Sequence, residues 1–495
     1  MASRGYTADP KWTELVTTNS DDEQSTFVWR ALGAETYRKL IGKDLAPPYW
    51  EVRLANFKSH GNAATKATGA RDSNRTRSDV AERAEEWQAW IAGDGTAYRV
   101  RHVLPDGSPG ASLDESAARA LADAELRERF QVEPLTLRQV SATPTPHPSR
   151  RDWVFTFEDR SPPTLKRGER RIAVEVAGDR VSDAYRFVFV PEDWQRQQRR
   201  QAATLGVLGI VRALIVIIVI IAAAAFGIVA WSRRSFPVAF AVRFFVLSVV
   251  FGSIGVINNW PRIVARFQTA QPLELQTMVS IVALGLGQLV MAGLFALVGG
   301  WALSELPHRA ERRPTLVLGL AVGAIASGLL TVIAHFTPAA GPLLGDLASP
   351  QATLPWAETA VATATALLTR AATLLALLIL SRRIASGGGA RRILGVAVLF
   401  VGGGIVVMSG SPETMGGWLA LAALTGASIV TIDQLLFAQD PRVIPMLLAG
   451  MAVLAAARGM GRHSHPDALL AGVLEIAAIA IVAVWWAREL GQPKV

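Results

Sequence analysis

The sequence predicts an α+β N-terminal domain built from a repeated unit, followed by an all-α polytopic transmembrane bundle of about nine helices. Charge supports this division: residues 1–200 hold 31 Lys and Arg and 30 Asp and Glu, whereas the rest of the chain holds 19 and 11. Hydropathy supports it as well, since long apolar runs begin only at residue 204. The third observation is a short motif that occurs twice before that point.

Composition excludes several functions. The chain has no cysteine, which rules out disulfides, thiolate catalysis and cysteine-bound metals. Most of its net charge of +9 lies between apolar segments, where basic residues mark membrane topology, so we expect no nucleic-acid partner. Because the sequence has no Gly-rich phosphate loop and no dinucleotide-binding fingerprint, we also expect no cofactor.

The N-terminal half is predicted to contain a duplicated α+β module. Residues 1–44 are expected to form a frayed segment that ends in a helix, and residues 45–194 to form the module itself. Its first copy begins with an alternating strand at 49–57 and continues through a polar, basic insertion at 58–79, predicted to be flexible. The copy ends in a hairpin turned at Gly93-Asp94-Gly95.

The duplication is visible as ordered pairs of residues. Trp50 matches Trp153, Gly93-Asp94 matches Gly178-Asp179, Tyr98-Arg99 matches Tyr185-Arg186, and Pro105 matches Pro191. In the second copy, a capping box at Ser112 and Glu115 is expected to start a helix, and four antiparallel strands are expected after it. The pairs predict that the two copies form structurally similar units.

The second half of the chain is predicted to cross a membrane. A basic linker at 195–203 leads into a helical domain at 204–488, and residues 489–495 form a tail. The first apolar run is long enough to cross a hydrocarbon core of about 30 Å. The spans are predicted at about 204–231, 237–257, 277–303, 315–335, 356–381, 393–409, 416–437, 441–457 and 467–487.

Loop charges orient these spans. Alternate loops and the tail carry 12 Lys and Arg on one side, against 7 on the other, and the positive-inside rule makes the basic side cytoplasmic. We therefore expect a bacterial inner-membrane protein with its duplicated module outside the cytoplasm. No apolar segment precedes the module, so we expect that an upstream segment is missing from this sequence; the alternative is a cytoplasmic module.

An ordered series of motifs over about residues 45–310 resembles the large bacterial members of the CAAX-protease and bacteriocin-processing (CPBP) family. The motifs are YWEVR, AYRVRHVLPDGSPGASLDESAARALAD, RRDWVFTFED, RRIAVEVAGDRV, YRFVFVPEDWQR and INNWPRIVARFQTAQPLELQ. The duplicated module also resembles the PepSY fold, in which a helix packs on an antiparallel sheet. The resemblance implies an intramembrane peptidase with an extracytoplasmic domain.

The catalytic signature that this resemblance implies is Glu-Glu followed four residues later by Arg, with the first Glu as general base. The chain has a single Glu-Glu pair, Glu85-Glu86, in its first half, so no catalytic residue is carried over. We therefore expect a relative of this family that does not cleave peptides. Its partners would be the lipid bilayer and, in a scaffold role, peptides or envelope proteins. The alternatives are an active CPBP-type endopeptidase with a relocated site and a small-solute transporter or membrane sensor.

Ionisable residues inside spans are candidates for function. A relocated site would draw on Glu475, Asp433, Glu358 and Arg370. The structural alternative is an interhelical ion pair of Glu475 with Arg370 or Arg243, since pairing lowers the cost of a buried charge.

Two further patterns favour structural explanations. His463 and His465 form a His-x-His cluster that could bind a metal, but a polar loop is the more common explanation, and no metal is predicted. Gly319, Gly323 and Ser327 stand at i, i+4 and i+8 and predict the close approach of two helices.

Overall fold

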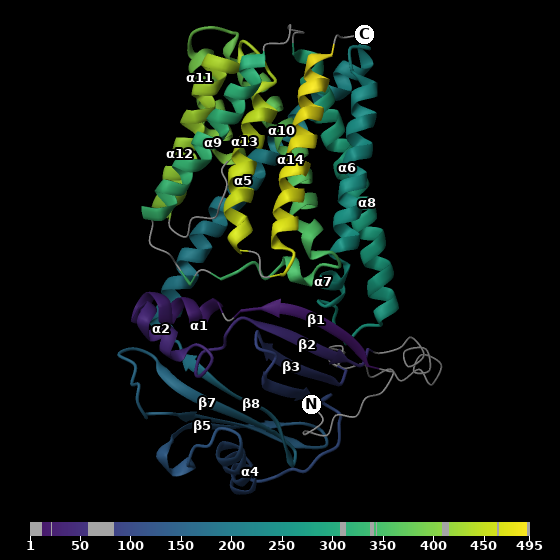
Figure 1. Cartoon of the computed structure of the whole chain (residues 1–495). Coiled ribbons are helices and arrows are strands. Elements are labelled where there is room, and N and C mark those ends of the chain that lie inside the picture. Colours follow the sequence, from purple (N-terminus) through teal and green to yellow (C-terminus); the bar gives the residue numbers. More distant parts are fainter. Residues whose placement is uncertain are drawn as a thin grey trace. The chain divides into compact units, whose positions relative to one another are not determined.

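The computed structural model describes residues 12–20, 22–57, 84–306, 313–336, 341–342, 344–407, 415–462 and 465–492. The insertion predicted at 58–79 therefore lies outside the described residues, as does His463. The chain divides into two compact units (Figure 1). The first comprises Met1–Arg196, Trp260–Val282 and Ala339–Gln351, and the second comprises Gln197–Asn259, Ala283–Pro338 and Ala352–Val495.

The first unit contains two four-stranded antiparallel sheets, each with its strands in chain order. Sheet 1 consists of β1 (Thr13–Asn19), β2 (Tyr49–Ala55), β3 (Glu86–Ala92) and β4 (Ala97–Val103). Sheet 2 consists of β5 (Arg138–Pro146), β6 (Arg151–Glu158), β7 (Glu169–Ala177) and β8 (Arg180–Phe189). The first sheet thus begins well before residue 45, because β1 pairs with β2 along its whole length.

The ordered pairs of the duplication fall in corresponding strands and turns of the two sheets. The matched tryptophans lie in the second strands, the Gly-Asp dipeptides in the turns between the third and fourth strands, and the Tyr-Arg dipeptides in the fourth strands. A β-bulge also recurs, at Trp90/Ile91 in sheet 1 and at Glu175/Val176 in sheet 2. The two sheets therefore share strand order, turn and bulge. The prediction that the Tyr-Arg dipeptides align is wrong, because the extra residue at the bulge is Tyr98 in sheet 1 and Ser182 in sheet 2.

The helices of the two copies differ in their place along the chain. In the first copy α1 (Asp22–Phe27), the π-helix η2 (Val28–Leu32) and α2 (Ala34–Leu40) follow β1. In the second copy α4 (Glu115–Glu128) precedes its sheet, as predicted. The predicted order of one helix followed by its strands therefore holds for the second copy alone.

Helix α4 packs on sheet 2 through a narrow apolar stripe. Ala118, Ala122 and Leu126 recur at i, i+4 and i+8 and are fully buried against strand residues such as Phe155 and Val174. Its N-cap differs from the predicted capping box at Ser112: the carboxylate of Asp114 accepts a hydrogen bond from the Ala117 amide at 2.8 Å.

Two connections between helices complete the first unit by packing against β1. The short helix α7 (Trp260–Val264) leads to Ala265, which is buried with Leu15 and Ala55. The Ala265 carbonyl accepts a hydrogen bond of 2.7 Å from the Arg53 guanidinium. Near the 3₁₀ turn η4 (Ser349–Gln351), the Thr18 hydroxyl donates to the Leu347 carbonyl. The two hydrogen bonds join β2 and the edge strand β1 to residues more than 200 positions away.

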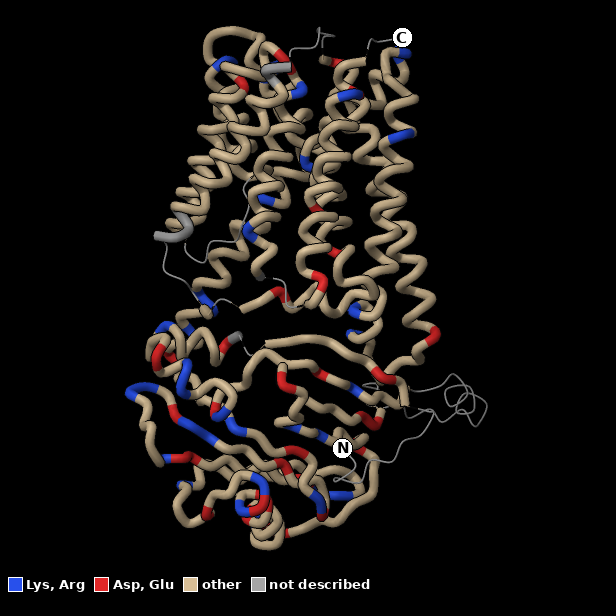
Figure 2. Tube along the Cα trace, in the orientation of Figure 1, with Lys and Arg blue, Asp and Glu red and all other residues tan. Residues whose placement is uncertain are grey.

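The second unit is helical, and the protein has seven long apolar helices in its described residues. They are α5 (Glu192–Ser232), α6 (Val238–Asn258), α8 (Leu273–Glu305), α10 (Pro355–Ala385), α11 (Ala390–Val407), α12 with its π-helical end η5 (Met415–Phe437), and α14 (Ala468–Gly491). Charged residues are sparse along these helices (Figure 2). The two other predicted spans are also helices, α9 (Arg313–Phe336) and α13 (Val443–Gly459), but their described apolar stretches are shorter. Length and hydropathy identify a multi-pass membrane protein.

Helices α9 and α13 approach each other closely where the sequence has small residues. A Cβ atom added to Gly323 would overlap the Leu447 carbonyl oxygen, and one added to Gly319 would stand 2.9 Å from the Met446 Cβ. Ser327 accepts a hydrogen bond of 3.0 Å from Arg458 on α13. The predicted close helix contact is confirmed.

Candidate functional site

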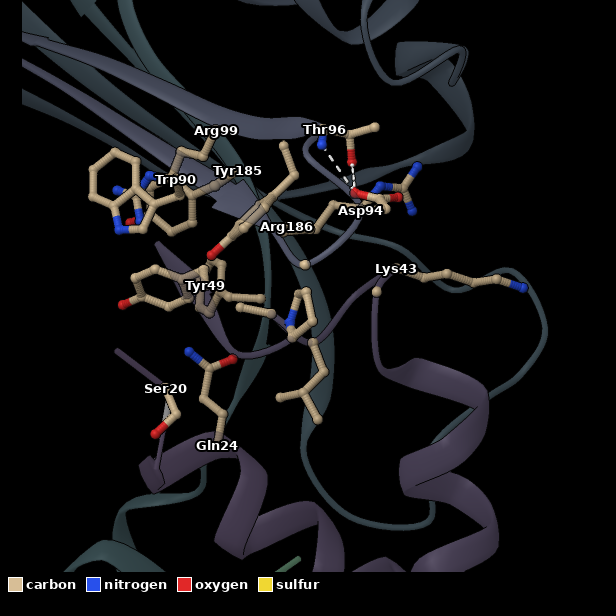
Figure 3. A pocket seen from close by; sticks show the side chains of 18 of the residues that line it. Ser20, Gln24, Lys43, Tyr49, Trp90, Asp94, Thr96, Arg99, Tyr185 and Arg186 are labelled. Atoms are coloured by element: carbon tan, nitrogen blue, oxygen red, sulfur yellow. Dashed lines mark hydrogen bonds between the residues drawn. The ribbon is translucent and has the colours of Figure 1, made fainter. Parts of the chain in front are cut away.

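A cavity of about 770 Å³ in the first unit is the candidate site. Its size is within the range of small-molecule and peptide side-chain pockets. The walls come from the segment between β1 and β2, the β3–β4 hairpin, the end of α4 and β8 (Figure 3). The lining residues are Ser20, Glu23, Gln24, Gly42, Lys43, Leu45, Ala46, Pro47, Tyr49, Trp90, Ala92, Gly93, Asp94, Thr96, Tyr98, Arg99, Phe130, Tyr185, Arg186 and Phe187.

The two Tyr-Arg dipeptides of the duplication both line this cavity. Tyr98-Arg99 comes from β4 and Tyr185-Arg186 from β8, and these two strands, the last of their sheets, contact each other. Tyr98 stands at the β-bulge, where an extra residue changes the direction of a side chain. The cavity is therefore lined by two copies of the same pair of side chains, one from each sheet.

Arg99 organises one wall of the cavity. Its guanidinium carbon lies 4.4 Å from the ring centre of Trp90 and 3.7 Å from that of Tyr185, which are cation–π distances (Figure 3). Its Nε donates to Asp183, a carboxylate with no exposed surface, at 3.0 Å. Burial opposes the charge of Arg99, but the hydrogen bond and charge of Asp183 outweigh it and raise the pKa of the guanidinium. Arg99 therefore stays a cation between two rings.

Arg186 is held by a second buried network. Asp44 lies 3.2 Å from Arg186 and 2.8 Å from Arg170, and Arg170 also donates to Asp159 at 2.8 Å. Asp44 and Arg170 are both less than 10% exposed. Paired and hydrogen-bonded charges of this kind hold a fixed geometry, so the direction of Arg186 is set before any ligand arrives.

The rest of the wall is aromatic and polar. Tyr49 and Tyr98 meet edge to face, with ring centres 5.9 Å apart. The turn is fixed by Asp94, which accepts hydrogen bonds from the amide (2.9 Å) and the hydroxyl (2.6 Å) of Thr96 (Figure 3). Burial raises the pKa of Tyr185, so its hydroxyl stays protonated at neutral pH. Since none of the described residues in this lining is a histidine, the wall offers rings, hydroxyls and fixed charges for binding.

The membrane candidates are found in three separate places. Glu358 accepts hydrogen bonds from the side-chain amides of Asn258 (3.1 Å) and Asn259 (2.7 Å). The carboxylate of Asp433 is paired with Arg382 at 2.8 Å. Glu475 accepts a hydrogen bond from the Thr363 hydroxyl at 2.7 Å. Each carboxylate thus has its own local partners.

The ion pair predicted for Glu475 is not formed with either arginine in the described part of the chain. Arg243 instead forms a two-pronged pair with Glu489, at 2.8 and 2.7 Å. The charge that acts on Arg370 is that of another cation, Arg212, which repels it. Arg243 pairs with Glu489 and not with Glu475 because helix α14 continues to Gly491 and brings Glu489 beside α6.

Of the two candidate metal ligands, only His465 lies in the described chain. Within that chain no group of three or more His, Asp or Glu is close enough to hold a metal ion. Comparisons of the sequence and structure with protein-family models, with curated proteins and with solved structures found no match. The geometry of the site is therefore the basis for a functional assignment.

Proposed function

We propose that this membrane protein binds peptides or peptide segments of envelope proteins in the cavity where its two repeats meet. The observation that carries the proposal is the convergence of both Tyr-Arg dipeptides on one cavity. Aromatic rings give a peptide apolar area and stacking surfaces, while fixed arginines and tyrosine hydroxyls pair with its carbonyl and carboxylate oxygens. Aromatic and Arg residues are also the residues that dominate binding energy at interfaces.

A binding role agrees with the absence of paired glutamates in the membrane half of the sequence. Cleavage of an amide needs a positioned base and a group that stabilises the oxyanion. The three candidate carboxylates, Glu358, Asp433 and Glu475, are engaged with Asn258 and Asn259, with Arg382 and with Thr363, respectively. A non-cleaving relative of the CPBP peptidases is the class that this arrangement favours.

Replacing Tyr185 with alanine tests the cavity. The variant loses one of the two rings that stack on Arg99, and we expect about tenfold weaker binding, or about 1.4 kcal/mol. The probe is a fluorescein-labelled peptide chosen from an array of random linear peptides for binding to the full-length protein. Fluorescence polarisation with purified protein in detergent measures the dissociation constant.

Leu135→Ala is the matched control, because Leu135 is 95% exposed and does not line the cavity. Its dissociation constant should equal that of the unmodified protein. The melting temperature of Tyr185→Ala shows whether this variant is folded. If the folded variant binds the peptide as tightly as Leu135→Ala does, the cavity is not the peptide site.

We also propose that the first unit lies outside the cytoplasm. The loop that contains Gly387 is on the basic side of the membrane half, whereas the connections at 260–282 and 339–351 carry few basic residues and belong to the first unit. Both connections contact β1, which supports the same side of the membrane for them and for the sheets.

Single cysteines at Gly387 and Gly345 test this topology, since the chain has no native cysteine. In intact cells an impermeant maleimide should label Gly345→Cys and should leave Gly387→Cys unlabelled until the cells are lysed. The reverse pattern would overturn the orientation.

A further inference from the structure

A second cavity, of about 350 Å³, lies at one end of the helical unit, between α10, α11 and η5. It is lined by Ser381, Arg382, Ala385, Arg392, Gly395, Val396, Leu399, Asp433, Gln434 and Ala438. Since α10 ends at Ala385 and α11 starts at Ala390, the cavity lies beside the ends of two long apolar helices. Its volume is at the lower end of the range for small-molecule sites.

The lining of this cavity has a net positive charge. Asp433 is almost fully buried, and its Oδ1 accepts a hydrogen bond from Arg382 at 2.8 Å. Gln434 donates to the other oxygen of Asp433 at 3.4 Å. The negative charge of Asp433 is thus matched by Arg382, and Arg392 adds one more positive charge to the lining. In the described chain, no hydrogen bond or ion pair involves the Arg392 side chain.

Arg392 also stands at the head of an apolar stripe on α11. Arg392, Val396 and Phe400 are spaced at i, i+4 and i+8 and so lie on one face of the helix. Val396 and Phe400 are 37% and 38% exposed, as side chains that face lipid would be. An amphiphile with an anionic head at Arg392 would therefore lay its acyl chain along Val396 and Phe400.

The local sequence disfavours this arrangement unless an anion is bound. Arg391 and Arg392 stand in the first turn of α11, at the positive end of the helix dipole, where cations are destabilising. Neighbouring arginines of the same segment have carboxylate partners: Arg382 pairs with Asp433, and Arg383 pairs with Glu305 at 2.7 Å. Basic pockets between transmembrane helices at the membrane surface are a common form of anionic lipid site.

We propose that this cavity binds the phosphate head group of an anionic phospholipid, with Arg392 as the main contact. Arg382, already oriented by Asp433, lines the same cavity and adds a second donor to the phosphate. The apolar stripe of α11 holds one acyl chain. The ligand is a membrane lipid rather than free phosphate because the cavity and the stripe are continuous along one helix face.

The experiment compares Arg392→Gln with Arg391→Gln in full-length protein purified in detergent. The two changes remove the same charge from adjacent exposed positions, but only Arg392 lines the cavity. The probes are short-chain phosphatidylglycerol, short-chain phosphatidylcholine and inorganic phosphate, each titrated by isothermal calorimetry. We expect phosphatidylglycerol to bind about tenfold more weakly to Arg392→Gln and with unchanged affinity to Arg391→Gln.

Each other result would overturn the proposal. Equal weakening by the two substitutions would mean a general effect of surface charge. Equal binding of phosphatidylcholine and phosphatidylglycerol would remove the selectivity for an anionic lipid. Equal binding of inorganic phosphate would mean that the apolar stripe takes no part. Melting temperatures of the two variants show that both remain folded.

Discussion

Replacing Gly323 with alanine is expected to destabilise the helical unit by about 3 kcal/mol. The new Cβ would overlap the Leu447 carbonyl oxygen, a backbone atom that cannot rotate away. The contact is reciprocal, since a Cβ on Gly450 of α13 would overlap the Leu320 carbonyl oxygen of α9. The two helices must therefore separate along their whole crossing, and the packing between them is lost.

Gly328→Ala is the control on the same helix. Its Cβ would lie 3.9 Å from the nearest atom, a Leu454 methyl group, which is an ordinary contact. Thermal unfolding of the full-length protein in detergent, followed by tryptophan fluorescence, measures both variants. A melting temperature for Gly323→Ala as high as that for Gly328→Ala would show that the helices do not touch at Gly323.

Asp183→Ala is expected to destabilise the first unit by about 3 kcal/mol, which corresponds to a fall in melting temperature of about 6–12 °C. The side chain of Asp183 is fully buried and is the partner of Arg99, which is only 20% exposed. Removal of the carboxylate leaves a buried guanidinium without its counter-charge, and that loss costs more than the pair itself contributes. The stack of Trp90, Arg99 and Tyr185 should loosen as well, so the tryptophan emission of the folded state should change.

The neighbouring Asp179→Ala provides the comparison. Asp179 stands in the β7–β8 turn, is 64% exposed and lies 3.8 Å from a still more exposed arginine, Arg180. Exposed pairs contribute about 0–1 kcal/mol, so this variant should unfold close to the unmodified protein. Equal melting temperatures for the two aspartate variants would mean that the Arg99–Asp183 pair does not hold the sheets.

The parts of the fold that could be predicted are those with strong local signals. Long apolar runs need only length and composition to predict membrane helices, and the repeat was visible because turn glycines and strand aromatics recur in order. Strand β1 was missed because its sequence, TELVTTN, has a single buried residue, Leu15. Its stability comes from pairing with β2 and from Ala265 and Leu347, which no local pattern reveals.

Contacts between residues far apart in the sequence were the part of the site that the sequence did not predict. The Tyr-Arg dipeptides were recognised as repeats, but their convergence depends on how β4 meets β8. The buried Asp183 gave no signal, because an acidic residue after a turn is usually exposed. For Arg243 the expected partner was wrong by 14 residues, about 21 Å along helix α14, because the helix continues past the predicted end of the span.

The contacts of β1 with Ala265 and Leu347 also have a consequence for synthesis. A ribosome adds about 5–20 residues per second, so Leu347 leaves it tens of seconds after Leu15 does. During that interval β1, the edge strand of sheet 1, can already pair with β2. The two connections that pack against β1 have not yet been made. An uncovered strand edge is a template for pairing with another chain. Assembly of the first unit therefore ends only after helix α9 has been made, and a fragment that stops at Arg196 would keep that edge open.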